Sequence, residues 1–198
     1  MKHHLCAWAA MVGLLVLLPA CTHQSVAAGL QSQVQPFVQT RDQAVAVVHA
    51  AKTDLGPMDI NVVNVKYAAL QQQANGYVGL VVESISTGSL DPAKSSADAL
   101  ALTKAIDGFN GSVAPLLQQS TGSPPPQMLN APLPLLDSWV PGFKDTLASS
   151  WGRYAGKLQG MSADERTALA EQFKASLAWP DFQDIAAGNA APQKSPTP

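Results

Sequence analysis

The chain has 198 residues, of which 46% are hydrophobic and only 13% are charged, with a formal net charge of −2. Its length fits one domain, at about 100 to 200 residues per domain, and its charged fraction is roughly half the ~25% of typical soluble proteins. No run of Lys or Arg occurs, which excludes a basic nucleic-acid-binding surface, so we expect no nucleic-acid partner.

The first predicted element is an N-terminal leader. Residues 1–4 include Lys2, and an apolar segment follows over residues 5–18. This order is typical of a signal peptide. The apolar segment is shorter than the ~20 residues that a transmembrane helix needs, and Pro19 follows it. We therefore predict a signal peptide over residues 1–20 rather than a permanent transmembrane anchor.

The leader ends in Leu18-Pro19-Ala20-Cys21, a large aliphatic residue followed at the cut by a small residue and a cysteine. This run resembles the lipobox of bacterial lipoproteins. The resemblance implies diacylation of the Cys21 sulfur and acylation of its new amine, so that palmitate-like chains anchor the protein to the membrane. In a Gram-negative cell, Thr22 after the cysteine implies the inner leaflet of the outer membrane, facing the periplasm. The alternative is an ordinary secretory leader, cut after Ala20 or near Ala28.

The mature chain is expected to begin with a flexible segment. Cys6 and Cys21 are the only cysteines, so removal of the leader leaves no pair for a disulfide, and the domain must be held by its core alone. Residues 21–35 are rich in Gln, Ser and Ala, and we predict that they form the lipidated N-terminus and a tether. Its ~14 residues would span up to ~45 Å when extended. A partly helical tether is the alternative.

The folded domain is placed at residues 36–187. Its first helix is predicted from Pro36, in the first turn, to Leu55, because apolar residues between them recur at helical spacing. Gly56-Pro57 then stops the helix.

A second and longer helix is predicted from Ile60 to Ile85, closed by Gly88, and we expect it to form the centre of the fold. A strand over residues 77–86 is the alternative, because this segment is β-branched and follows a possible hairpin turn at Asn75-Gly76.

The third helix is predicted to start at a capping-box-like Ser95 and Asp98 and to pack on the second helix. Pro115 is expected to kink or end it. The next segment, residues 118–134, is rich in proline, and we predict a long semi-extended crossover. Docking of this segment into an aromatic groove of a partner is the alternative.

The fourth helix is predicted from an aromatic stripe that ends before Gly160. Such a stripe usually faces a core, but aromatic residues are also favoured at protein interfaces. Four of its residues are therefore candidates for ligand or partner binding: Trp139, Phe143, Trp151 and Tyr154.

The fifth helix is predicted to begin with a capping box at Ser162 and Glu165 and to stop before Trp179. A short helical turn is expected over residues 181–187, followed by a disordered tail over residues 188–198. Together these elements predict an all-α bundle of about five helices, with the Pro-rich crossover between the third and fourth.

The sequence offers few groups for catalysis. His49 is the only histidine of the domain, and a metal site needs three or four ligands, so we predict no metal and no cofactor. Phosphate-binding loops and a nucleophile elbow are absent from the sequence. Glu83 lies among apolar residues, where burial would raise its pKa toward that of a general acid. The alternative is an exposed Glu83, or one paired with Lys66, Lys104 or Arg153.

These features favour a lipid-anchored, periplasm-facing protein of the cell envelope without enzymatic activity. We expect its partners to be the membrane, through Cys21, and another envelope protein that it serves as an accessory, adaptor or inhibitor. The alternatives are a glycan-active hydrolase that uses Glu83, or a carrier of a small apolar ligand. No oligomeric state follows from the sequence.

Overall fold

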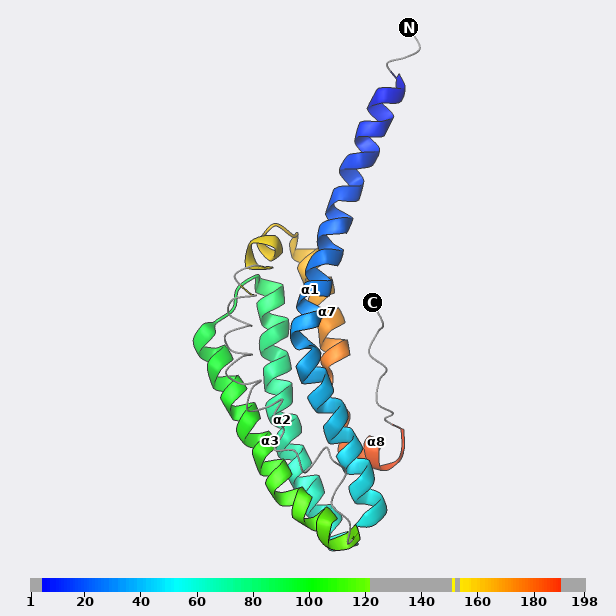
Figure 1. The fold of residues 1–198 in the computed structure, drawn as a ribbon. Coiled ribbons are helices and arrows are strands. Elements are labelled where there is room, and N and C mark those ends of the chain that lie inside the picture. Colours follow the sequence, from blue (N-terminus) through cyan, green and yellow to red (C-terminus); the bar gives the residue numbers. More distant parts are fainter. Residues whose placement is uncertain (1–4, 122–150, 152–153, 190–198) are drawn as a thin grey trace.

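The computed structural model describes residues 5–121, 151 and 154–189, with side chains from residue 26 onward. All regular elements in this part of the chain are helices (Figure 1), so the predicted all-α bundle is confirmed. The predicted crossover lies largely in residues 122–150, outside the described part, and so does most of the predicted tail.

The first helix, α1, runs over Leu5–Asp54 and is much longer than predicted. Val26, Leu30 and Val34 follow one another at four-residue spacing and are buried in the core. The predicted tether is therefore wrong for residues 26–35. Burying a Val or Leu side chain contributes about 1.5–3 kcal/mol, so these three residues together outweigh the ~3 kcal/mol cost of a proline inside a helix.

Pro36 lies within α1 instead of starting a helix. It has no N–H to donate to the carbonyl of Ser32 one turn earlier. The hydroxyl of Thr40 donates to the Pro36 carbonyl at 3.0 Å, and the adjacent Phe37 is fully buried. Tertiary packing on both sides of Pro36 thus keeps the helix continuous.

The second helix, α2, covers Pro57–Thr87, so it begins three residues before the predicted start at Ile60, with Pro57 in its first turn. The strand alternative for residues 77–86 is wrong, because they are helical and Tyr77 and Val81 are buried in the core. α2 contacts α1, α3, α7 and α8 and is the central helix. It ends at Gly88, whose φ of 69° lies in the left-handed region that favours glycine.

The third helix, α3, covers Pro92–Thr121 and packs on α2. It begins earlier than predicted, because an Oδ1 atom of Asp91 accepts hydrogen bonds from the backbone N–H groups of Ala93 and Lys94 at 2.9 and 3.2 Å. The predicted start at Ser95 and Asp98 is therefore wrong. The helix also continues past Pro115 instead of ending there, since buried residues on both sides of the proline hold it against the core.

The remaining helices follow the predictions more closely. Residue 151 and residues 154–159 are helical. α7 covers Ala163–Leu177 and begins with the predicted capping box, in which the hydroxyl of Ser162 accepts from the Glu165 N–H and the Glu165 carboxylate accepts from the Ser162 N–H. The predicted short turn is α8, Phe182–Ala186.

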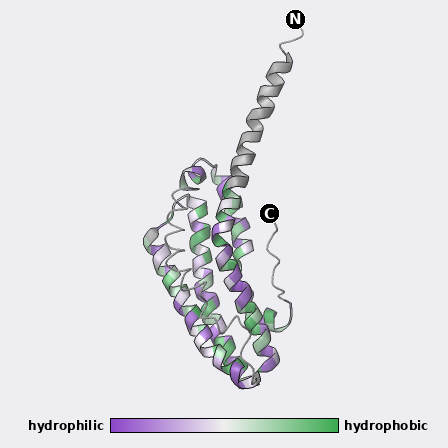
Figure 2. Cartoon of the chain, viewed as in Figure 1, coloured by the Kyte–Doolittle hydropathy of each residue, from purple (hydrophilic) through white to green (hydrophobic). Residues whose placement is uncertain are grey.

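Aromatic rings from α1, α2, α3 and the α7–α8 segment meet in the core. Phe37 lies 5.2 Å from Tyr77 and 5.8 Å from Trp179, measured between ring centroids. Tyr67 contacts Phe109, Trp179 and Phe182 at about the same range, 6.2–6.3 Å. Hydrophobic and hydrophilic residues are mixed along each helix (Figure 2), as expected for helices with one buried face.

Candidate functional site

Cys21, the predicted lipidation residue, lies on α1, the same helix that supplies Val26, Leu30 and Val34 to the core. Val26 is the fifth residue after Cys21 and is only 1% exposed. The candidate modification site is therefore connected to the folded core by little more than one helical turn.

Tyr154, a predicted partner-binding residue, packs against the backbone of Gly29 on α1. A Cβ atom at Gly29 would overlap the Tyr154 ring, and the Nζ of Lys157 lies 5.9 Å from the centre of that ring. Tyr154 therefore attaches helix 154–159 to α1, and its role in ligand or partner binding stays a prediction.

Trp151, the next candidate, belongs to the core, with 7% of its surface exposed. Its indole N–H is buried and has no hydrogen-bond partner in the part of the chain that the structure describes. Trp151 therefore packs in the core, and its role in ligand or partner binding stays a prediction. The other two candidates, Trp139 and Phe143, lie outside the described residues.

Glu83 is exposed on α2, so the burial that would make it a general acid is not found. Its carboxylate accepts a hydrogen bond and forms an ion pair with Lys94 Nζ at 2.7 Å, and the two side chains are 61% and 48% exposed. The hydrogen bond and the charge of Glu83 raise the pKa of Lys94. Glu83 thus pairs with Lys94 and not with Lys66 or Lys104, and Arg153, the third basic residue named as an alternative, lies outside the described residues.

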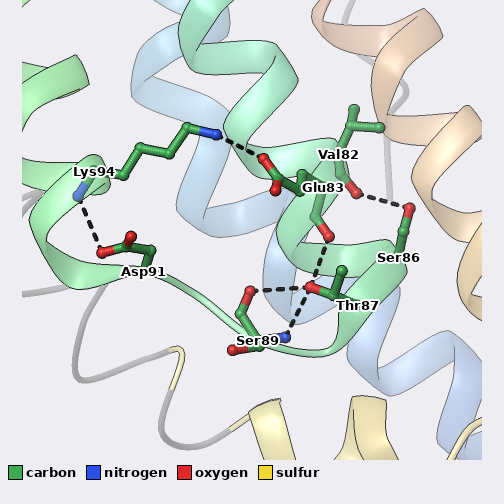
Figure 3. A network of polar contacts seen from close by, with 7 residues as sticks. All are labelled: Val82, Glu83, Ser86, Thr87, Ser89, Asp91 and Lys94. Atoms are coloured by element: carbon green, nitrogen blue, oxygen red, sulfur yellow. Dashed lines mark hydrogen bonds and ion pairs between the residues drawn. The ribbon is translucent and has the colours of Figure 1, made fainter.

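The polar groups around Glu83 serve the turn between α2 and α3 (Figure 3). The hydroxyl of Thr87 donates to the Glu83 carbonyl at 2.9 Å and accepts from the Ser89 N–H at 3.3 Å. Ser86 donates to the Val82 carbonyl at 2.9 Å. Helix ends leave such backbone groups without intrahelical partners, so this cluster closes one helix and starts the next.

Arg41, which the sequence analysis did not single out, is the most deeply buried charged side chain among the described residues, at 4% exposure. Its Nη1 donates to the carbonyls of Ser176 and Ala178 at 2.8 and 3.3 Å, and its Nη2 pairs with Asp42 at 2.9 Å. Arg41 therefore closes the C-terminal end of α7. In the sequence, Arg41 stands one helical turn after Phe37, on the apolar stripe of the helix, and this position could have indicated that Arg41 is buried.

Arg166 has the same kind of role at the other end of α7. Its Nε donates to the Ser86 carbonyl at 3.0 Å, and its Nη1 donates to the carbonyls of Leu158 and Met161 at 3.2 and 2.8 Å. One guanidinium thus joins the end of α2 to helix 154–159.

A side-chain network around Gln71 holds the segment between α7 and α8. Gln71 Nε2 donates to the Pro180 carbonyl at 3.1 Å and to Asp181 at 2.9 Å, and the Tyr67 hydroxyl donates to the same carbonyl at 2.9 Å. These bonds give the Pro180 carbonyl two donors from α2, so the network is structural.

Over the described part of the chain, His, Cys, Asp and Glu residues form no group able to hold a metal ion. His49 is partly buried on α1. None of the described helices is both long and apolar enough to cross a membrane.

The first turns of α2 carry three exposed hydrophobic side chains. Met58, Val62 and Val65 are 85%, 40% and 60% exposed. Their spacing of four and three residues places them on one helix face. We call these three residues the α2 apolar face.

Comparison of the chain with protein-family models, with curated proteins and with solved structures gives no match.

Proposed function

We propose that this chain is a bacterial lipoprotein, anchored through Cys21, that faces the periplasm from the inner leaflet of the outer membrane. The observation that carries this proposal is the run Leu18-Pro19-Ala20-Cys21 directly after a short apolar leader. Several acyl chains on one cysteine hold a protein firmly, because each buried CH₂ contributes ~0.8 kcal/mol.

We further propose that the domain acts as a non-enzymatic accessory that binds another envelope protein. The partners of its main charged side chains support this proposal. Arg41 and Arg166 bind backbone carbonyls, and Glu83 is exposed and paired with Lys94. These groups are used by the fold, whereas the α2 apolar face is left open for a partner.

Replacing Cys21 by Ala tests the anchor. In membrane fractions of the producing bacterium, the Cys21→Ala protein is expected to lose the acyl modification, measured by mass spectrometry of the N-terminal peptide. It should also leave the outer-membrane fraction or keep its leader uncut. Cys6→Ala is the matched control, because this cysteine lies inside the leader and its loss should leave processing and lipidation unchanged.

Two results would contradict the anchor. One is an unmodified Cys21 in the wild-type mature protein. The other is normal cleavage and membrane retention of the Cys21→Ala variant, which would point to an ordinary secretory leader.

A photo-crosslinking amino acid at Val65 tests the accessory role in intact cells. We expect one envelope protein to be captured from Val65 in the anchored protein, and to be lost when Cys21 is replaced by Ala. Gln172, exposed on α7, is the control position. Equal capture from both positions, or capture from neither, would count against a partner bound on the α2 apolar face.

A further inference from the structure

We propose that α1 itself mounts the domain on the membrane, so that one defined end of the bundle lies against the lipid headgroups. This end consists of the turn between α2 and α3 and the turn at residues 160–162, and we call it the anchor end. The inference rests on the proposed lipidation of Cys21, but it concerns orientation and reach, which lipidation alone does not determine.

The short connection between Cys21 and Val26 limits how far the domain can lie from the membrane surface. Val26 is held in the core, and five helical residues rise only ~7.5 Å, at 1.5 Å per residue. Even if these five residues were fully extended, they would span at most ~18 Å. A 14-residue tether would have allowed ~45 Å, so the domain stays close to the lipid surface.

The direction of α1 decides which end of the bundle lies close to the membrane. α1 and α2 are joined by residues 55 and 56 alone and run in opposite directions, so the start of the buried part of α1 lies beside the end of α2. Tyr154 packs on Gly29 at this level. Figure 1 shows α1 leaving the bundle at this end, where α2 ends and α3 begins.

The charges at the anchor end offer no separate attraction to the membrane. Among the described residues in and next to these two turns, the acidic side chains are Glu83, Asp91, Asp164 and Glu165, and the basic side chains are Lys94, Lys157 and Arg166. Anionic lipids attract clusters of Lys and Arg, and this mixture, with more acidic than basic groups, is not such a cluster. The orientation therefore comes from α1, and it should not depend on salt or on the anionic lipid content.

The α2 apolar face lies toward the opposite end of the bundle. α2 has 31 residues, and at 1.5 Å per residue its two ends lie ~45 Å apart. A partner that binds Met58 would therefore be met well away from the lipid surface.

Energy transfer from the protein to the membrane tests this orientation. After processing, Cys6 has left with the leader and the Cys21 sulfur is acylated, so Ser89→Cys or Met58→Cys supplies the only free thiol. Both positions are exposed, one at the anchor end and one at the opposite end of α2. Each lipidated full-length mature protein is labelled with a donor dye and reconstituted in phosphatidylethanolamine–phosphatidylglycerol vesicles that contain a headgroup-labelled acceptor.

We expect transfer to be several-fold more efficient from position 89 than from position 58, at low and at high salt. A Gly/Ser insertion of about 14 residues between Ser25 and Val26 behaves as a flexible coil, and it should bring the two efficiencies close together. The same insertion after Asn189 is the control and should leave the difference unchanged.

Equal transfer from the two positions in lipidated protein would overturn this inference and leave the proposed anchor standing. An insertion before Val26 that changes nothing would overturn it as well. A mature protein without lipid on Cys21 would instead remove the proposed function and this inference together.

Discussion

Arg41 stabilises the fold by binding the carbonyls at the end of α7, and its guanidinium is nearly inaccessible to water. A buried charge is costly unless hydrogen bonds satisfy it, and its fork of donors suits two acceptors that lie close together. The position is thus specific for arginine.

Replacing Arg41 by Met should destabilise the domain by about 2–4 kcal/mol, because two carbonyls and the Asp42 carboxylate lose their donor. Urea unfolding of the leaderless protein, followed by circular dichroism, measures this loss. Lys104→Met is the matched control, because Lys104 is exposed on α3 and should change stability by less than ~0.5 kcal/mol. Similar losses from both variants would contradict the role of Arg41.

Two buried tyrosines should make stability depend on alkaline pH. Burial, with a smaller effect of Asp181, raises the pKa of Tyr67 above the ordinary 10.0, and burial alone raises that of Tyr77 well above it. The folded chain therefore holds these protons more tightly than the unfolded chain does. Stability is complete below pH 10 and should fall as the pH rises above it.

Urea midpoints measured between pH 8 and pH 11 test this dependence, because this range brackets the ordinary tyrosine pKa of 10.0. Tyr77→Phe should reduce the loss of stability at the alkaline end and leave the midpoint below pH 9 with little pH dependence. A wild-type midpoint that stays constant through this range would contradict the burial of both phenols.

Among the helices, α1 differs most from expectation, and its contact with helix 154–159 passes through Gly29. Glycine inside a helix usually costs stability relative to alanine, about 0.5–1 kcal/mol. At Gly29 the Tyr154 ring occupies the place of a Cβ atom. The absence of a side chain is therefore needed for the two helices to pack.

Replacing Gly29 by Ala should destabilise the domain by about 1–3 kcal/mol, the usual cost of overpacking. Gly79→Ala is the matched control, because nothing lies within 4 Å of a Cβ at this exposed position in α2, and it should stabilise by about 0.5–1 kcal/mol. Thermal unfolding of the leaderless proteins compares them. A Gly29→Ala protein as stable as Gly79→Ala would show that Tyr154 does not pack there.

For the molecule as a whole, the boundary of the domain moves from Pro36 to Val26. Removing residues up to 35 would delete Val26, Leu30 and Val34 from the core. Their burial contributes roughly 5 kcal/mol or more in total, which is comparable with the entire stability of a typical domain, about 5–15 kcal/mol.

A chain that starts at Pro36 should therefore lose cooperative unfolding, measured by calorimetry or by urea titration. A chain that starts at Val26 is the control and should unfold cooperatively, close to the protein that starts at Thr22. If the chain from Pro36 is as stable as the other two, residues 26–35 are a tether after all.

Features that depend on a few neighbouring residues could be predicted from the sequence. The stop at Gly56-Pro57, the glycine after α2 and the capping box at Ser162 all appear in the fold as predicted. Each results from contacts within one or two helical turns, so the residues that cause it are adjacent in the chain. The lipobox at Cys21 is read in the same local way, and it stays a prediction.

The start of α1 and the roles of Arg41 and Tyr154 could not be predicted in this way. The segment before Pro36 has the composition of a linker, and only its contact with other helices reveals that three of its residues are buried. Arg41 binds carbonyls more than 130 residues away in the chain. Such long-range contacts decide which face of a helix is buried, because burial depends on the neighbouring helices in space and not on the residues next to it in sequence.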